Sequence, residues 1–347
     1  MFKKYKNKRV FITGHTGFKG SWLSLILSNY GAEVCGYALE PNTNPSMFKS
    51  LNIKNQISKS IIGNILDYDL LEKSILDFKP DIIFHLAAQP LVRLSYIKPL
   101  LTYQTNVIGS LNVLEAAKKF NCAVINVTTD KCYENKETNR GYLEEDSLGG
   151  YDMYSSSKAC SEIMTSSYRR SFNLNVATVR AGNVIGGGDW AKDRLIPDCI
   201  RSFESNKPIE IRNPKAIRPW QHVVEPLFGY MMLGEKMFES AQFAQAFNFG
   251  PEKNNNQKVF DIVNKFVNLY GKGEVNINQS DDLHESKILM LNSNKAKSIL
   301  NWSVKLDIEK TLEKTAKWYN HFYKKDTNML EYTLAQIKEY EELWKKS

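Results

Sequence analysis

The chain has 347 residues, of which 42% are hydrophobic and 24% charged, and its formal net charge is +8. This composition is that of an ordinary globular enzyme, with one large domain or two modest ones, and it excludes fibrous or disordered classes. The basic residues form no single stripe and no apolar run is long enough to span a bilayer, so we expect neither a nucleic-acid nor a membrane partner.

Five cysteines are spread along the chain, at positions 35, 122, 132, 160 and 199. Their number is odd, and no two of them have the spacing of a metal site. The N-terminus lacks the pattern of a signal peptide. We therefore predict reduced thiols, no metal site and a cytoplasmic location.

The first predicted element is a buried strand at Arg9–Thr13, and a helical apolar pattern follows over Ser21–Tyr30. Between them lies a turn with the spacing G-x-x-G-x-x-G. A glycine turn between a strand and a helix is typical of dinucleotide binding, with the phosphates at the helix N-terminus. This spacing resembles the extended short-chain dehydrogenase/reductase superfamily. The candidate cofactor-binding residues of the turn are Gly14, Thr16, Gly17, Phe18, Lys19 and Gly20.

A second strand is predicted at Glu33–Leu39, and an acidic residue is expected near its end to hold the adenosine ribose. Ala38 occupies the expected position, and Glu40 is the candidate substitute. No arginine follows that could bind a 2′-phosphate, which favours NAD over NADP. His15 is bulky beside the phosphate turn, so we expect it to weaken cofactor binding.

Further elements alternate between strand and helix. Strands are predicted at Asp81–His85 and Ala123–Val127, with a long amphipathic segment, Pro99–Phe120, between them. This alternation predicts an α/β fold: a Rossmann-like, doubly wound parallel sheet with helices on both faces and a smaller C-terminal substrate-binding lobe. Further candidate cofactor contacts, partly by resemblance to the superfamily, are Asn64, Ile65, Leu86, Ala87, Ala88, Gln89, Asn106 and Thr128.

The run Thr128-Thr129-Asp130-Lys131 follows the strand Ala123–Val127, at the sheet edge where ligands bind. Downstream, Tyr154 and Lys158 are four residues apart and share one face of a helix. A lysine ammonium beside a phenol lowers the phenol pKa, so such a tyrosine can exchange protons near neutral pH. On its own, this spacing is more typical of a solvated helix face. In company with the glycine turn and the strand-end run, it predicts a catalytic pair.

Six longer motifs carry a narrower resemblance, which runs from Gly14 to Lys287 and continues in LNWSVKLDIEKTL. They are GHTGFKGSWL, HLAAQPLVRLSY, TTDKCYEN, RAGNVIGGGDWAKDRLIPD, RPWQHVVEP and DLHESK. The chain resembles the CDP-glucose 4,6-dehydratases. The related dTDP-glucose dehydratases carry glutamate where this chain has Lys131.

The resemblance implies an NAD-dependent lyase that converts CDP-glucose to CDP-4-keto-6-deoxyglucose, a precursor for deoxysugars of polysaccharides such as lipopolysaccharide O-antigen. Tyr154 and Lys158 would oxidise C4 with bound NAD, Thr129 would hold the C4 oxygen, and Asp130 would protonate the leaving hydroxyl at C6. Lys131 would either remove the C5 proton or stabilise the enolate. The resemblance also implies a homodimer or a dimer of dimers, and substrate contacts at Asn183, Arg194, Leu195, Arg218 and His284.

One of these positions keeps a second interpretation. Arg218 suits a diphosphate, or it stacks on Trp220 for structure alone. His222 is expected to be structural. Residues 1–172 are predicted to form the NAD-binding domain, with return strands near 175–180 and 247–250. Residues 181–347 would build the substrate lobe and end in helices near 306–323 and 328–346.

Two other functions compete with this one. A nucleotide-sugar 4-epimerase of the same fold needs the Tyr154–Lys158 pair but no elimination residues, so Asp130 and Lys131 argue against it. A non-catalytic NAD-binding scaffold would not need the pair. The residues alone do not select the base of the nucleotide.

Overall fold

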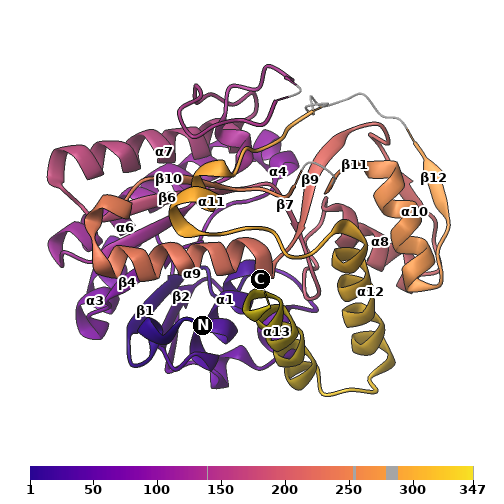
Figure 1. The fold of residues 1–347 in the computed structure, drawn as a ribbon, viewed down its shortest axis with the longest axis horizontal. Coiled ribbons are helices and arrows are strands. Elements are labelled where there is room, and N and C mark those ends of the chain that lie inside the picture. The colour runs from indigo at the N-terminus through magenta and orange to yellow at the C-terminus, as the bar shows by residue number, and fades with distance from the viewer. Residues whose placement is uncertain (139, 253–254, 279–287, 347) are drawn as a thin grey trace.

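A parallel sheet forms the centre of the molecule (Figure 1). The structure, a computed structural model, describes residues 1–138, 140–252, 255–278 and 288–346. All pairings in this sheet are parallel, and its seven strands lie in the order β10-β6-β5-β4-β1-β2-β3. In that order the strands are β10 (Ala246–Phe249), β6 (Val176–Ala181), β5 (Ala123–Val127), β4 (Ile82–His85), β1 (Arg9–Thr13), β2 (Glu33–Ala38) and β3 (Lys59–Ile62).

Helices cover both faces of this sheet because successive side chains of each strand point to opposite sides. Phe11 packs with helices α3 and α6, whereas Val10 and Ile12 pack on the face of α1 and α9. The doubly wound fold that the sequence predicts is therefore confirmed. The helices of this layer are α1 (Phe18–Asn29), α2 (Met47–Ser50), α3 (Tyr68–Phe78), α4 (Val92–Ile97), α5 (Pro99–Tyr103), α6 (Gly109–Lys119), α7 (Met153–Phe172) and α9 (Val224–Glu239).

Strand β1 lies at the point where the strand order reverses. Val10 of β1 pairs with Val34 of β2 on one side and with Ile82 of β4 on the other. In open α/β sheets, ligands bind outside the carboxyl ends of the strands at such a switch point. The segments that follow β1, β4, β5 and β6 meet there.

The smaller lobe is built from short strands and helices. Strand β7 (Asn183–Ile185) pairs with β9 (Ile217–His222), which also pairs with β11 (Asn256–Lys258), and β8 (Ile209–Ile211) pairs with β12 (Val275–Ile277). Its helices in the described ranges are α8 (Leu195–Glu204), α10 (Val259–Tyr270) and α12 (Ile308–Lys324). Helix α11 (Asn294–Leu300) packs against α9 and β10, and α13 (Met329–Lys345) packs against both α12 and α9. The lobe follows β6 in the chain, and β10 returns from it to the sheet edge (Figure 1).

The glycine run at 186–188 joins the two parts. Trp22 of α1 donates its indole N–H to the Gly187 carbonyl at 2.9 Å. A Cβ at Gly187 would lie 2.0 Å from the Trp318 ring of α12. Only glycine fits between these packed elements, so the run is held in place where it borders the cavity described below.

The amphipathic segment Pro99–Phe120 contains α5 and α6, which a π-helical turn, η3 (Gln104–Ile108), separates. One predicted boundary is wrong. Helix α1 begins at Phe18, three residues before the prediction, because Gly17 is its N-cap. None of the helices in the described ranges combines the length and apolar character that a bilayer crossing requires.

Candidate active site

One cavity of about 1010 Å³ opens at the carboxyl ends of the central strands and extends to the smaller lobe. This volume is at the upper end for small-molecule sites, so the cavity has room for an extended ligand or for two ligands. Most predicted site residues line it, namely Gly14, Thr16, Gly17, Phe18, Lys19, Gly20, Asn64, Ile65, Leu86, Ala87, Ala88, Thr128, Thr129, Asp130, Lys131, Tyr154, Lys158, Asn183, Arg194, Leu195 and Arg218.

The glycine turn borders the cavity between β1 and α1. Gly14 has a φ of +80°, and a Cβ there would lie 2.7 Å from the Ala87 backbone nitrogen. A Cβ on Gly20 would lie 2.1 Å from the Gly14 carbonyl oxygen, so the turn closes only with glycine at this position. Gly17 is the N-cap of α1. The free backbone N–H groups of that helix end suit a diphosphate, so these residues fit a dinucleotide.

The next part of the cavity lies beyond β2. Ala38, Leu39 and Glu40 line it, and the Thr16 hydroxyl donates to the Leu39 carbonyl at 2.8 Å. The Asn64 side-chain oxygen accepts the Leu66 N–H at 3.0 Å, which fixes the start of the following turn. Glu40, the candidate residue for binding the adenosine ribose, thus lines the cavity two residues after the end of β2.

His15 does not face the cavity, which contradicts the expectation that its bulk weakens cofactor binding. Its ring is fully buried and lies against Gly36 of β2, where a Cβ would be 2.2 Å from the imidazole. Its Nε2 is 2.8 Å from the Ser60 hydroxyl. Burial lowers the pKa of His15 to about 4, so the ring is neutral. His15 therefore packs the turn onto the sheet.

Two predicted cofactor contacts lie behind the lining of the cavity. Asn106 accepts the Gln89 N–H at 2.8 Å and donates to the Ser157 hydroxyl at 2.9 Å. The π-helical turn η3 carries Asn106, and its wider backbone lets this amide lie between β4 and α7. Gln89 and Asn106 therefore support the cavity wall rather than line it.

The strand-end run forms a short turn, η4 (Asp130–Cys132), with Thr129 as its N-cap. The Asp130 Oδ1 accepts from the Thr129 hydroxyl at 3.1 Å and lies 3.4 Å from the Lys131 Nζ. The other oxygen, Oδ2, is buried and has no hydrogen-bond partner in the described part of the chain. A buried carboxyl oxygen without a partner, at the wall of a cavity, is suited to a ligand hydroxyl.

Tyr154 and Lys158 lie on the inner face of α7, as predicted, but the protonation predicted for the phenol is wrong. Burial raises the pKa of Tyr154 to about 12, although hydrogen bonding to Thr129 lowers it. Lys158 donates from Nζ to the Val127 carbonyl at 3.0 Å. Burial lowers the pKa of Lys158 to about 8. Burial therefore sets the direction of the Tyr154 pKa, and the positive charge that lowers this pKa comes from Arg194.

Cationic side chains converge on the wall of this cavity. Burial and the charges of Arg194, Lys158 and Lys131 together lower the pKa of Lys19 to about 7, although Asp130 raises it. Arg194, the N-cap of α8, lies 2.9 Å from the Asp189 Oδ2. So many cations at a single site favour anionic ligands such as diphosphates.

On the lobe side, Asn183 of β7, Leu195 of α8 and Arg218 of β9 line the cavity. Arg218 donates from Nη1 to the Ile217 carbonyl at 3.0 Å. His222 is buried and does not line the cavity, and burial lowers its pKa to about 3. His284 lies outside the described residues.

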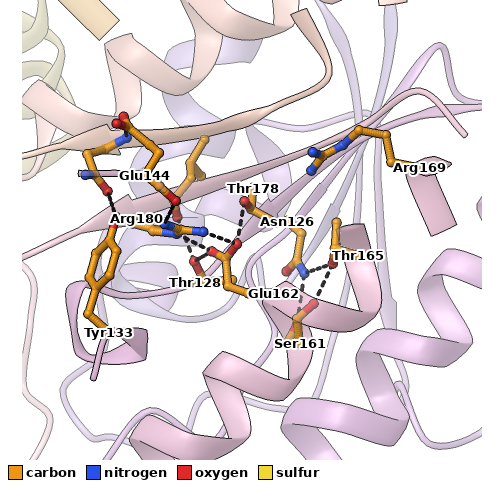
Figure 2. A network of polar contacts seen from close by, with 12 residues as sticks. Asn126, Thr128, Tyr133, Glu144, Ser161, Glu162, Thr165, Arg169, Thr178 and Arg180 are labelled. Atoms are coloured by element: carbon orange, nitrogen blue, oxygen red, sulfur yellow. Dashed lines mark hydrogen bonds and ion pairs between the residues drawn. The ribbon is translucent and has the colours of Figure 1, made fainter. Parts of the chain in front are cut away.

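A buried polar network beneath the strand-end turn was not predicted (Figure 2). It centres on Glu162 of α7 and Arg180 of β6, whose closest charged atoms are 2.8 Å apart. Glu162 lies four residues after Lys158, just as Lys158 lies four residues after Tyr154. This repeated spacing is the sequence signal that could have identified Glu162. Arg93 and Arg212 also line the cavity and were not predicted.

Together the fold and the site define an α/β protein whose cavity suits a dinucleotide and a second anionic ligand. The GDP-mannose 4,6 dehydratase family matches residues 11–315, and the chain belongs to this family. It is 47% identical to the CDP-glucose 4,6-dehydratase of Salmonella typhimurium over 97% of each chain. It is 27% identical to the dTDP-D-glucose 4,6-dehydratase of Dictyostelium discoideum, over 76% of this chain and 62% of that protein.

Solved structures agree with this fold. The dTDP-glucose 4,6-dehydratase of Bacillus anthracis in complex with NAD has a TM-score of 0.78 and 22% identity, covering 91% of this chain and 98% of that one. A UDP-glucuronic acid 4-epimerase of Bacillus cereus with its substrate and NAD has a TM-score of 0.80 and 22% identity, covering 91% and 100%. At these identities the likeness establishes the fold.

Proposed function

We propose that the protein is a CDP-glucose 4,6-dehydratase, which converts CDP-glucose to CDP-4-keto-6-deoxyglucose with bound NAD. The observation that carries this proposal is the meeting of Tyr154, Asp130 and Lys131 at one cavity wall, in a chain 47% identical to such an enzyme. A 4-epimerase needs only the tyrosine and lysine of α7. An acid and a cation beside them are what elimination of water requires.

The glycine turn supports NAD as the cofactor. Gly14, Gly17 and Gly20 would hold its diphosphate at the start of α1, and Glu40 would hold its adenosine ribose. The chemistry that bound NAD supplies is reversible hydride storage, which makes C4 a ketone at the start and reduces C6 at the end.

The first oxidation needs a base at the C4 hydroxyl. Tyr154 takes this proton, and Thr129, which hydrogen-bonds the phenol, holds the C4 oxygen. Because burial keeps the empty-site phenol protonated at neutral pH, Tyr154 must gain positive charge nearby before it can act. Lys158 and the ligands that fill the cavity supply this environment.

Elimination needs an acid at C6 and charge stabilisation at C5. Once C4 is a ketone, the C5 proton is α to a carbonyl and can be removed. Asp130 is placed to protonate the leaving hydroxyl through its unbonded Oδ2. The Lys131 ammonium, 3.4 Å from Asp130, either accepts the C5 proton after losing its own or stabilises the enolate.

A turnover panel tests this function. The purified protein with added NAD is incubated with CDP-glucose, dTDP-glucose, UDP-glucose and GDP-mannose, and products are separated and identified by mass. We expect a product lighter by one water from CDP-glucose at the highest kcat/KM. A product of unchanged mass with inverted C4 would establish an epimerase, and binding of NAD without turnover of any sugar would establish a scaffold.

We further propose a homodimer that acts in the cytoplasm and supplies deoxysugars for polysaccharides such as O-antigen. Apolar side chains are exposed on adjacent helices, with Ile97 75% and Leu100 70% accessible near the start of α5 and Ile163 58% accessible on α7. A second copy would bury them. All five cysteines are free thiols, which suits a reducing compartment.

A further inference from the structure

Two charged side chains lie beneath the catalytic turn, Thr128–Tyr133, and neither of them lines the cavity. Glu162 and Arg180 are at most 3% exposed, and Arg180 donates from Nη2 and Nε to the two Glu162 oxygens at 2.8 and 2.9 Å. Burial alone would raise the pKa of Glu162 and lower that of Arg180. Their mutual attraction reverses both directions, so both side chains stay charged. Such pairs seldom add stability over apolar packing, so this one calls for another role.

The pair bonds to both ends of the catalytic turn. The Thr128 hydroxyl donates to Glu162 at 2.5 Å, and Arg180 donates from Nη1 to the Tyr133 hydroxyl at 2.7 Å. Figure 2 shows Thr128 beside Glu162 and Tyr133 beside Arg180. Between these two residues lie Thr129, Asp130 and Lys131. The position of the whole turn relative to α7 is therefore set from below.

Glu162 also faces the lysine of the site. It is four residues after Lys158 on the inner face of α7, and its charge raises the pKa of Lys158, which burial lowers to about 8. The other titratable groups around this ammonium are Cys132 of η4, His85 of β4, Lys19 of α1 and Tyr154, one turn earlier on α7. Of these groups, Glu162 alone is a carboxylate.

We propose that the Glu162–Arg180 pair is a positioning pair: it holds the Thr128–Tyr133 turn against α7 and keeps the Lys158 ammonium charged, so that proton and hydride transfer at C4 depend on it. The proposal rests on the proposed function, because its consequence is the rate of the first oxidation. Neither side chain lines the cavity.

The test is the Glu162→Gln variant, compared with wild type in NADH formation under single turnover. Glutamine keeps the shape but leaves Arg180 unpaired and removes the carboxylate beside Lys158. We expect the rate at saturation to fall about 100-fold, as for a small misplacement of reacting groups, with NAD affinity nearly unchanged. We also expect the alkaline limb of the pH–rate profile to move about one unit lower, since the pKa of Lys158 falls.

The matched control is Thr165→Val, on the same face of α7 one turn beyond Glu162 (Figure 2). The Thr165 hydroxyl accepts from the Asn126 amide at 2.9 Å and donates to the Ser161 carbonyl at 2.7 Å, without contact to the turn. The Thr165→Val variant therefore loses buried hydrogen bonding comparable to that around Glu162. We expect a lower melting temperature with an unchanged rate and pH profile.

If Glu162→Gln does not fold, Tyr133→Phe tests the same link more gently, since it removes only the hydroxyl that joins Arg180 to the turn. We expect a rate about tenfold lower, the worth of one hydrogen bond to a charged group. A folded Glu162→Gln protein, or Tyr133→Phe in its place, with wild-type rate and pH profile would overturn the positioning pair. A wild-type protein that forms no NADH with any sugar nucleotide would instead overturn the proposed function, and the pair with it.

Discussion

At the scale of single residues, the site depends on a phenol that is protonated when the cavity is empty, because burial raises the pKa of Tyr154 to about 12. Replacing it tests whether it is the C4 base. In Tyr154→Phe, NADH formation with CDP-glucose should fall at least about 100-fold, the usual contribution of a general base. Tyr332→Phe, on α13, is the control and should retain full activity. Rapid NADH formation by Tyr154→Phe would assign the proton to another group.

The proposed mechanism assigns Lys131 to the second step, loss of water, and not to the first oxidation. In Lys131→Ala the first oxidation should survive, because Tyr154 and Lys158 are untouched, while loss of water should stop. The measurement is NADH formed on mixing, together with exchange of the C5 hydrogen with heavy water. NADH without C5 exchange makes Lys131 the base, and NADH with exchange makes it an electrostatic aid to elimination. Complete turnover by the variant would exclude both roles.

Lys19 predicts a pH dependence of ligand binding. Its pKa is lowered to about 7 by burial and by neighbouring cations, so it loses its proton as pH rises through neutrality. An anionic ligand favours the charged form, so affinity for NAD or CDP-glucose should be higher at about pH 6 than at about pH 8. Titrations at both pH values measure this. In Lys19→Met the difference should disappear, and an unchanged difference would contradict the role of Lys19.

At the scale of elements, two glycines of the same turn are needed for different reasons: Gly20 lets the turn close, and Gly17 leaves room for NAD. Gly20→Ala places a Cβ 2.1 Å from the Gly14 carbonyl, so the turn itself must open. Gly17→Ala meets nothing closer than 3.4 Å, and its backbone is in the ordinary extended region. We expect Gly20→Ala to lose stability, and Gly17→Ala to keep its melting temperature but lose NAD affinity. Equal melting temperatures for the two variants would refute this distinction.

His15 shows how an element can mislead a sequence-based prediction. Its position in the turn suggested contact with the cofactor, but the ring packs under β2 against Gly36. We expect His15→Ala to lower the free energy of unfolding by about 2 kcal/mol, as for a buried contact with a hydrogen bond, without tighter NAD binding. A gain in NAD affinity at unchanged stability would restore the original expectation.

The alternation of strands and helices, with buried apolar runs such as Ala123–Val127, was enough to predict a doubly wound parallel sheet. Tyr154 and Lys158 could be placed together because four residues make one helical turn. Glu162 was missed although it continues that spacing, because nothing local marks Arg180 as its partner. The π-helical turn around Asn106 could not be predicted either, since it depends on contacts with Gln89 and Ser157.

At the scale of the whole molecule, the exposed apolar residues of α4, α5 and α7 predict self-association. We expect sedimentation to give twice the 39.8 kDa of one chain. Leu100→Glu places a charge in this face and should give the single-chain mass. Glu331→Lys, a charge change on α13, is the control and should leave the dimer intact. A wild-type protein that sediments as one chain would rule out this interface.

The central claim is that one site removes a hydride from C4, keeps it during loss of water and returns it to C6. Incubating the protein and NAD with CDP-glucose that carries deuterium at C4 tests this directly, with the product analysed by NMR. We predict deuterium at C6 of a 4-keto-6-deoxy sugar, delivered within the same molecule. Deuterium retained at C4, or a C6 methyl group without deuterium, would contradict the mechanism.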